Sequence, residues 1–195
     1  MEEIADRYRR RAAEFERKIA AVPPDAWSNQ SPCAQWTARD VVDHVVAMHG
    51  VMLGPGGGSF GTQVRDDPLR AFQEARAAVQ EVLDNPELAG QEADTPTGKL
   101  TAEQHIDQVV SDDLVLHGWD LARATGQDET MDPDDVERLW RSTTSIPAEM
   151  MERYRTPGAF GPGIEVFGAE VPVPADAPLQ DRLLGLIGRD PSVRR

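Results

Sequence analysis

The sequence contains a single cysteine, Cys33, among its 195 residues. An intrachain disulfide is therefore excluded, and a reducing, cytoplasmic setting is expected. The sequence also lacks any run that approaches the roughly 20 consecutive apolar residues of a membrane-spanning helix. The segment from Met1 to Arg11 is charged from its second residue, which argues against a secretory signal. We therefore expect a soluble protein that does not cross a membrane.

Basic residues are also scarce, because 20 Lys and Arg stand against 34 Asp and Glu, giving a formal net charge of −14 at pH 7. A surface of this sign repels the phosphate backbone of nucleic acids and anionic lipid headgroups. We therefore expect neither a nucleic-acid partner nor a membrane partner. The length suits one domain with its own hydrophobic core, and we predict a single domain over residues 1–195.

Apolar residues recur at steps of three and four along much of the chain, which predicts amphipathic helices. Several of these stripes are preceded by residues that favour a helix start, either a capping box or an acidic residue followed by proline. The predicted helices begin at Ile4, at Thr37 with Asp40, at Asp67-Pro68, at Thr101 with Gln104 and at Asp132-Pro133, and a last amphipathic segment runs from Leu179 to Ile187.

Two other segments are predicted to be irregular or extended. Gly54 to Gly61 holds five glycines and is expected to form a surface loop. The weak alternation from Ile164 to Val173 permits one short hairpin, with Pro172 confining its second strand to an edge. Four or five helices with so little strand predict an all-α, antiparallel four-helix bundle with an additional C-terminal helical segment.

The helix that begins at Thr101 carries two ionisable residues inside its apolar stripe. Asp113 and His117 are four residues apart and share a face with Leu121. An ionised carboxylate or an unpaired imidazole in a core costs roughly several kcal/mol unless a partner compensates for it. The pattern therefore predicts that something binds Asp113 and His117.

His44 shows the same conflict on the helix that begins at Thr37, since it lies between the apolar residues Val41 and Met48. One divalent ion would satisfy all three groups, because the spacing of Asp113 and His117 aims them at one point and His44 can approach from the facing helix. Two imidazoles and a carboxylate suit Zn²⁺, Ni²⁺ or Fe²⁺ better than Ca²⁺ or Mg²⁺. Zn²⁺ is the first expectation. The alternative is a purely structural set, held together by ion pairing and hydrogen bonds.

The other cysteine, histidine and tryptophan side chains that could take part in chemistry are predicted to have mainly structural roles. Cys33 is interpreted as a small buried filler, with a nucleophile or a soft metal ligand as the alternatives, because no histidine or basic residue lies beside it in the sequence. His49 and His105 are predicted to be solvent-exposed or to act behind the metal ligands. Trp119 and Trp140 are predicted to be core aromatics. No catalytic or cofactor-binding residue is assigned from the sequence.

Two stretches of the chain resemble a known family. The first reads Pro32-Cys33-x-x-Trp36-Thr37-x-x-Asp40-Val41-x-x-His44-Val45, and the second runs from Asp113 through His-Gly-Trp-Asp-Leu-Ala-Arg-Ala-Thr-Gly, which begins at His117. These stretches, with Asp176-Ala177-Pro178 and Gly188-Arg189-Asp190-Pro191 near the end, resemble the actinobacterial branch of the DinB-like superfamily. This branch is related to the N-terminal domain of mycothiol-dependent maleylpyruvate isomerase.

The resemblance implies a metal-dependent thiol transferase or isomerase-like enzyme whose ion is held by His44, Asp113 and His117. It also implies mycothiol as co-substrate, presented to a small electrophilic substrate. Asp113 stands where the isomerase-like proteins usually place glutamate, which favours monodentate binding. The chain is further expected to lack the additional C-terminal domain of the isomerase, so isomerisation itself is not expected.

Other functions remain open from the sequence. A non-catalytic metal-binding or stress-related bundle is the first alternative, and a bundle whose metal site is vestigial is the second. Thiol-dependent turnover would distinguish the enzyme from a non-catalytic metal-binding bundle. Retention of metal on purification would distinguish both of these from a bundle with a vestigial metal site. The apolar helix faces also permit a homodimer, but the sequence does not determine the oligomeric state.

Overall fold

The computed structural model describes residues 3–34, 36–53, 67–95, 98–159 and 166–192. It divides into two compact units, Met1–Glu129 and Thr130–Arg195. That residues 1–195 form a single domain stays a prediction. None of the described helices is both long and apolar enough to cross a bilayer.

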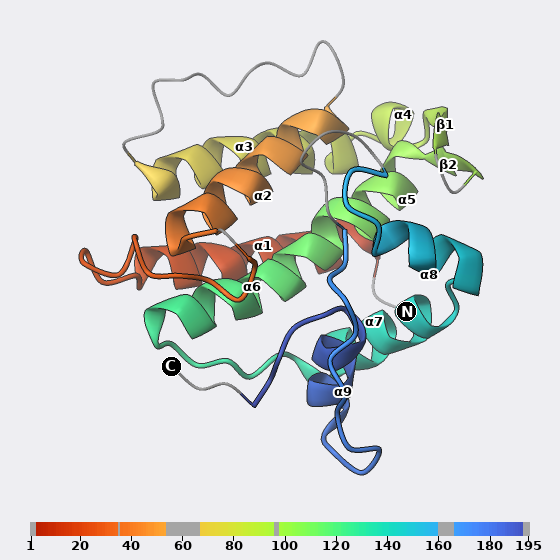
Figure 1. Ribbon diagram of the computed structural model, residues 1–195. Coiled ribbons are helices and arrows are strands. Elements are labelled where there is room, and N and C mark those ends of the chain that lie inside the picture. The colour runs from red at the N-terminus through yellow and green to blue at the C-terminus, as the bar shows by residue number, and fades with distance from the viewer. Residues whose placement is uncertain (1–2, 35, 54–66, 96–97, 160–165, 193–195) are drawn as a thin grey trace. The chain divides into compact units, whose positions relative to one another are not determined.

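Four long helical segments build a bundle in the first unit (Figure 1). They are α1 (Ile4–Ala20), α2 (Ala38–Met52), α3 (Pro68–Asp84) and a run that ends in α6 (Asp112–Thr125). Helix α1 packs against α3 and α6, and α2 packs against the same two helices. This arrangement confirms the predicted all-α four-helix bundle.

Helix α2 begins, and helix α6 ends, at residues that capping chemistry predicts. In α2, the Thr37 side chain accepts from the backbone N–H of Asp40, and the Asp40 carboxylate accepts from the backbone N–H of Thr37. Hydrogen bonds from the Thr37 side chain and backbone lower the pKa of Asp40. Helix α6 ends at Gly126, whose φ of 71° closes the helix in the left-handed conformation that glycine adopts without a Cβ penalty.

The run that ends in α6 is interrupted by a π-helical turn. It comprises α5 (Ala102–Ile106), η2 (Asp107–Ser111) and α6. The turn is fixed to α1 by the ion pair of Arg7 with Asp107 at 2.7 Å, and the first residue of α6 is fixed to α1 by that of Arg11 with Asp112 at 3.1 Å. The Arg11 side chain is only 1% exposed, so its charge depends on such partners. These pairs hold the helix in register immediately before Asp113, and π-helical turns are frequent at functional sites.

Apolar side chains from all four bundle helices fill the core, and Phe15 meets Phe72 edge to face at a centroid distance of 5.0 Å. His49 lies within this core and is fully buried, so its predicted exposure is wrong. Its Nδ1 donates to the Val45 carbonyl, at 2.7 Å, and its Nε2 lies 3.0 Å from the Tyr8 hydroxyl. These hydrogen bonds let a histidine occupy an apolar face, because they satisfy both ring nitrogens.

Acidification is expected to destabilise the protein through His49. Burial lowers its pKa to about 4, against opposing effects of the Val45 carbonyl and of Asp113. In the unfolded chain the pKa is about 6.5. Because the unfolded chain takes up the proton first, the stability from neutral His49 is complete above about pH 6.5 and falls by roughly 3 kcal/mol toward pH 4.

Denaturant titrations of metal-free protein at about pH 7.5 and about pH 4.5 will measure this loss. The His49→Gln variant is the comparison, because glutamine fills much of the same space without titrating. Its loss of stability between the two pH values should be smaller than that of the wild type. Equal losses in the two proteins would contradict this role of His49.

Between α3 and α5 lie a short helix and the hairpin of this fold. They are α4 (Pro86–Ala89), β1 (Glu92–Thr95) and β2 (Gly98–Thr101), with Glu92 opposite Thr101 in an antiparallel pair. The hairpin was predicted instead at residues 164–173. Residues 166–173 are the described part of that segment, and they form no strand, so the predicted position is wrong there. Ile164 and the predicted Gly54 to Gly61 loop lie outside the described residues.

The second unit contains α7 (Pro133–Thr144), α8 (Ala148–Tyr154) and α9 (Leu179–Leu186), which provide the predicted C-terminal helical segment. Helix α7 packs against α9. The described part of the expected hairpin, residues 166–173, lies along the end of α9. The N–H groups of Gly168 and Val171 donate to the carbonyls of Ile187 and Gly185 at 3.1 and 2.9 Å. These hydrogen bonds satisfy the backbone groups that a strand partner would otherwise satisfy.

Candidate metal centre

Three predicted ligands come together where α2 packs against α6. The Nε2 atom of His44 lies 3.6 Å from Oδ2 of Asp113, and the ring centroids of His44 and His117 are 4.9 Å apart. One donor atom from each of the three residues lies within 4.8 Å of the other two. The structure thus brings all three predicted residues into one group, while their binding of a metal ion stays a prediction.

The group lies at the edge of the core, with one side reaching solvent. The side chains of His44 and Asp113 are 29% and 26% exposed, whereas that of His117 is 9% exposed. His44 is less buried than expected because the core face of α2 runs through Val45 and His49. A small molecule can therefore approach His44 and Asp113 while His117 stays shielded.

An aromatic ring from the segment before α2 covers the two imidazoles. The centroid of Trp36 lies 4.7 Å from that of His44 and 5.8 Å from that of His117. Such a ring excludes water from one side of the group and restricts the rotation of both imidazoles. Trp36 thus forms a wall of the centre.

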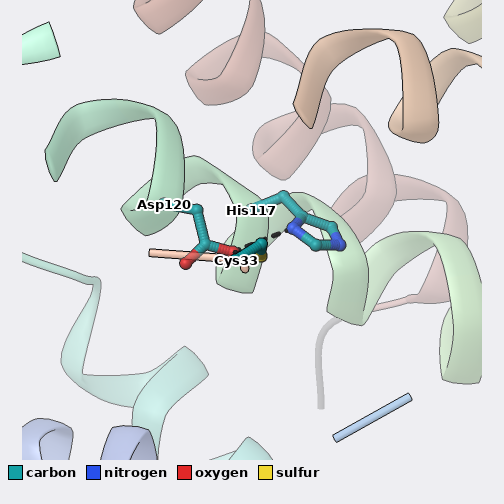
Figure 2. Close-up of side chains that lie close together, drawn as sticks. All are labelled: Cys33, His117 and Asp120. Carbon is teal, nitrogen blue, oxygen red and sulfur yellow. Dashed lines mark hydrogen bonds and ion pairs between the residues drawn. The ribbon is translucent and has the colours of Figure 1, made fainter. Parts of the chain in front are cut away.

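A second group of polar side chains lies on the far side of His117. Its Nδ1 is 2.9 Å from Oδ2 of Asp120, and the Cys33 thiol donates to the same oxygen at 3.3 Å. Figure 2 shows these three side chains together, with the other nitrogen of the His117 ring on the side away from Asp120. Asp120 is fully buried, so its carboxylate requires hydrogen-bond donors, and the imidazole and the thiol are two of them.

The surroundings of His117 favour a positive charge. Burial opposes the charged imidazole, but the hydrogen bonds to Asp120 and Cys33 and the negative charges of Asp113 and Asp120 outweigh it and raise the pKa of His117 to about 10. In the absence of any bound ion, the imidazolium neutralises part of the charge of the two carboxylates. A cation at this position is therefore electrostatically compatible with the centre.

Asp120 and Trp36 were not predicted as functional residues, and the predicted burial of Cys33 was wrong. Asp120 follows His117 by three residues on the same helix, so the helical spacing could have identified it. Cys33 is half-buried, and its thiol contacts a carboxylate 87 positions away in the sequence. The residues next to Cys33 in the sequence give no sign of this contact, because it depends on the packing of α6.

The other candidate residues lie outside the centre. His105 is half-buried on α5. Trp119 is 2% exposed, as predicted for a core aromatic. Trp140 is only half-buried, and the guanidinium carbon of Arg182 lies 4.7 Å from its ring centroid. The core prediction for Trp140 is therefore wrong.

Fold and site together define a helical-bundle protein with imidazole and carboxylate donors on facing helices, an arrangement in which such bundles build metal and cofactor sites. Residues 8–122 match the family model of the mycothiol maleylpyruvate isomerase N-terminal domain. The chain belongs to this family, whose fold is DinB-like. The family resemblance inferred from the sequence is thereby confirmed.

Two relatives are uncharacterized proteins from strains CDC 1551 and H37Rv of Mycobacterium tuberculosis. Each is 30% identical over 177 residues, which cover 90% of this chain and 91% of the relative. The chain is also similar to the crystal structure of a histidine-to-alanine mutant of mycothiol-dependent maleylpyruvate isomerase. The TM-score is 0.52 at 14% identity, over 80% of this chain and 72% of that one, which shows a shared fold.

Proposed function

We propose that this protein binds one divalent metal ion through His44, Asp113 and His117 and catalyses mycothiol-dependent transfer chemistry on a small electrophile. The observation that carries the proposal is the convergence of three donor atoms from two helices to within 4.8 Å of one another. Membership of a family named for mycothiol maleylpyruvate isomerase supports mycothiol as the thiol. The cytoplasm is the proposed location of this activity.

The donor set fits a borderline transition metal. Two imidazoles and one carboxylate favour Zn²⁺, with Ni²⁺ and Fe²⁺ as alternatives, over the all-oxygen sites of Mg²⁺ and Ca²⁺. The short side chain of Asp113 favours binding through one oxygen. When bound, the ion would supply Lewis acidity that favours the thiolate form of a small thiol.

Side chains of the protein leave one side of the proposed metal site open to small molecules and cover another side. The exposed fractions of His44 and Asp113 leave an approach for small molecules from solvent, and Trp36 closes the side that lies over the imidazoles. An apolar ring next to the donors lowers the local dielectric constant, which strengthens electrostatic interactions inside the centre. These features suit a reaction between a small thiol and a small electrophile.

The test combines metal analysis with a thiol assay. Untagged protein purified without added metal is subjected to elemental analysis and then loaded separately with Zn²⁺, Ni²⁺ and Fe²⁺. Each form is incubated with mycothiol and a panel of electrophiles that includes maleylpyruvate and an activated aryl halide, and both the consumption of thiol and the conversion of the electrophile are followed. We expect about one equivalent of metal per chain and thiol consumption that requires the loaded protein.

The outcomes separate the proposed function from its alternatives. Metal binding without thiol consumption or electrophile conversion, across mycothiol and other small thiols, would favour a non-catalytic metal-binding bundle. Failure to retain or take up any of the three metals would rule out the metal-dependent enzyme. Turnover that is the same before and after metal removal would also contradict the proposal.

A further inference from the structure

His117 belongs to two overlapping groups of potential metal ligands. The first group is His44, Asp113 and His117, and the second is Cys33, His117 and Asp120. Each group offers three donor atoms within 4.8 Å of one another. Since the ligand atoms alone do not distinguish the two groups, the hydrogen bonds around the shared imidazole must decide between them.

An imidazole presents two nitrogens on different sides of its ring, and each can serve only one partner at a time. The Nδ1 atom of His117 is occupied by Asp120, at 2.9 Å. The other nitrogen lies on the side away from Asp120, as Figure 2 shows. It is therefore the nitrogen that remains to serve the group formed with His44 and Asp113.

The carboxylate of Asp120 is suited to hold a proton donor in place. One oxygen, Oδ2, accepts from both the imidazole Nδ1–H and the Cys33 thiol, and the residue is completely shielded from solvent. Histidines that bind metals usually donate their second N–H to such a carboxylate, which fixes the tautomer and makes the ligating nitrogen more basic. Asp120 comes from the same helix as His117, so their relative position is set by the helix itself.

We infer that Asp120 is a positioning residue that orients His117 toward the ion, and that Cys33 is a hydrogen-bond donor to Asp120 and not a metal ligand. This inference rests on the proposed metal site and deepens it, because it chooses between the two groups. The Cys33 thiol shares Oδ2 with the imidazole, which helps to satisfy a buried negative charge.

The inference predicts the effect of removing the charge of Asp120 while keeping its shape. In Asp120→Asn the uncharged amide holds the Nδ1–H less strongly, so Zn²⁺ affinity should fall by about 10- to 100-fold. Affinity is measured by competition with a chelating dye. Asp84→Asn is the matched control, because Asp84 is an exposed carboxylate on α3 in the same unit, and it should bind Zn²⁺ like the wild type.

Cobalt substitution gives a second readout that a purely structural role would not change. Co²⁺ loaded into the wild type should show ligand-field bands without a thiolate-to-cobalt charge-transfer band, and Asp120→Asn should shift the ligand-field bands. Cys33→Ser keeps a donor to Asp120, so its spectrum should match that of the wild type. This comparison needs no Asp120 variant and decides the role of Cys33 even if Asp120→Asn fails to fold.

Two results would overturn the inference while leaving the proposed function intact. One is equal Zn²⁺ affinity of the wild type and a folded Asp120→Asn protein. The other is a thiolate charge-transfer band that disappears in Cys33→Ser, because it would make Cys33 a ligand. A wild-type protein that binds neither ion would instead overturn the metal site itself and this inference with it.

Discussion

Replacement of His117 by alanine is expected to remove the metal ion from the purified protein, whereas replacement of His105 by alanine is expected to leave it in place. Structural zinc sites provide about 10–16 kcal/mol of apparent binding free energy from four ligands, or roughly 2.5–4 kcal/mol per ligand. Loss of one ligand should therefore weaken binding by about 10²- to 10³-fold. His44→Ala and Asp113→Ala should have effects of the same order.

The measurement is elemental analysis of each variant, purified in parallel, followed by titration with Zn²⁺. His105 is a suitable control because it is a half-buried histidine on α5 in the same unit, so its loss tests for a general effect of removing an imidazole. Circular dichroism establishes that each variant is folded before its metal content is compared. Retention of a full equivalent by folded His117→Ala would contradict the assignment of this residue as a ligand.

The second large effect is expected in the C-terminal unit, where Gly188→Ala should disrupt the contact between two glycines. Gly188 has a φ of +88°, and a Cβ atom there would lie 2.5 Å from the Cα of Gly168. The left-handed conformation costs an alanine about 1–2 kcal/mol, and relieving an overpacked contact typically costs about 1–3 kcal/mol more. The expected loss is therefore roughly 2–5 kcal/mol, because backbone atoms have to move.

Gly126→Ala separates the two contributions. Gly126 also has a positive φ, of +71°, but a Cβ atom there would meet nothing within 4 Å, so only conformational strain is expected. Hydrogen exchange should show protection lost in α7 and α9 of Gly188→Ala, while α1 and α6 keep theirs. If Gly188→Ala is no more disruptive to its own unit than Gly126→Ala is to the first, the close contact has no energetic importance.

The helices of this protein were predictable because local chemistry specifies them. Thr37 and Asp40, like Thr101 and Gln104, form the capping boxes that their spacing predicts. The π-helical turn at η2 was not predicted, because its register depends on ion pairs with α1, such as that of Arg7 with Asp107. The spacing of apolar residues within one helix does not indicate an ion-pair partner on another helix.

The hairpin shows the limit of reading alternation in a short segment. Glu92–Thr95 has few apolar residues and is largely exposed, so no alternating pattern indicated its pairing. The segment that did alternate, ending at Val173, instead runs beside α9. The hydrogen bonds of the second segment go to the end of α9 and not to a strand, and β-propensity is weak enough to be overridden in this way.

The candidate site was predictable where a polar residue conflicted with an apolar stripe. His44, Asp113 and His117 show this conflict, and the structure brings them together. Asp120 follows His117 by three residues on the same helix and was predictable from that spacing. The positions of Cys33 and Trp36 were not predictable, because both belong to the segment before α2, whose path over the site depends on tertiary packing.

The long sequence separation within the centre has a consequence for the order of events during synthesis. Cys33 and Asp120 are 87 positions apart, and a nascent chain that ends before α6 carries only His44 of the three proposed ligands. Closing a loop of that length costs chain entropy, which the packing of α6 must offset. The ion would therefore be acquired after α6 has emerged and docked, so that metallation reports the completion of folding of the first unit.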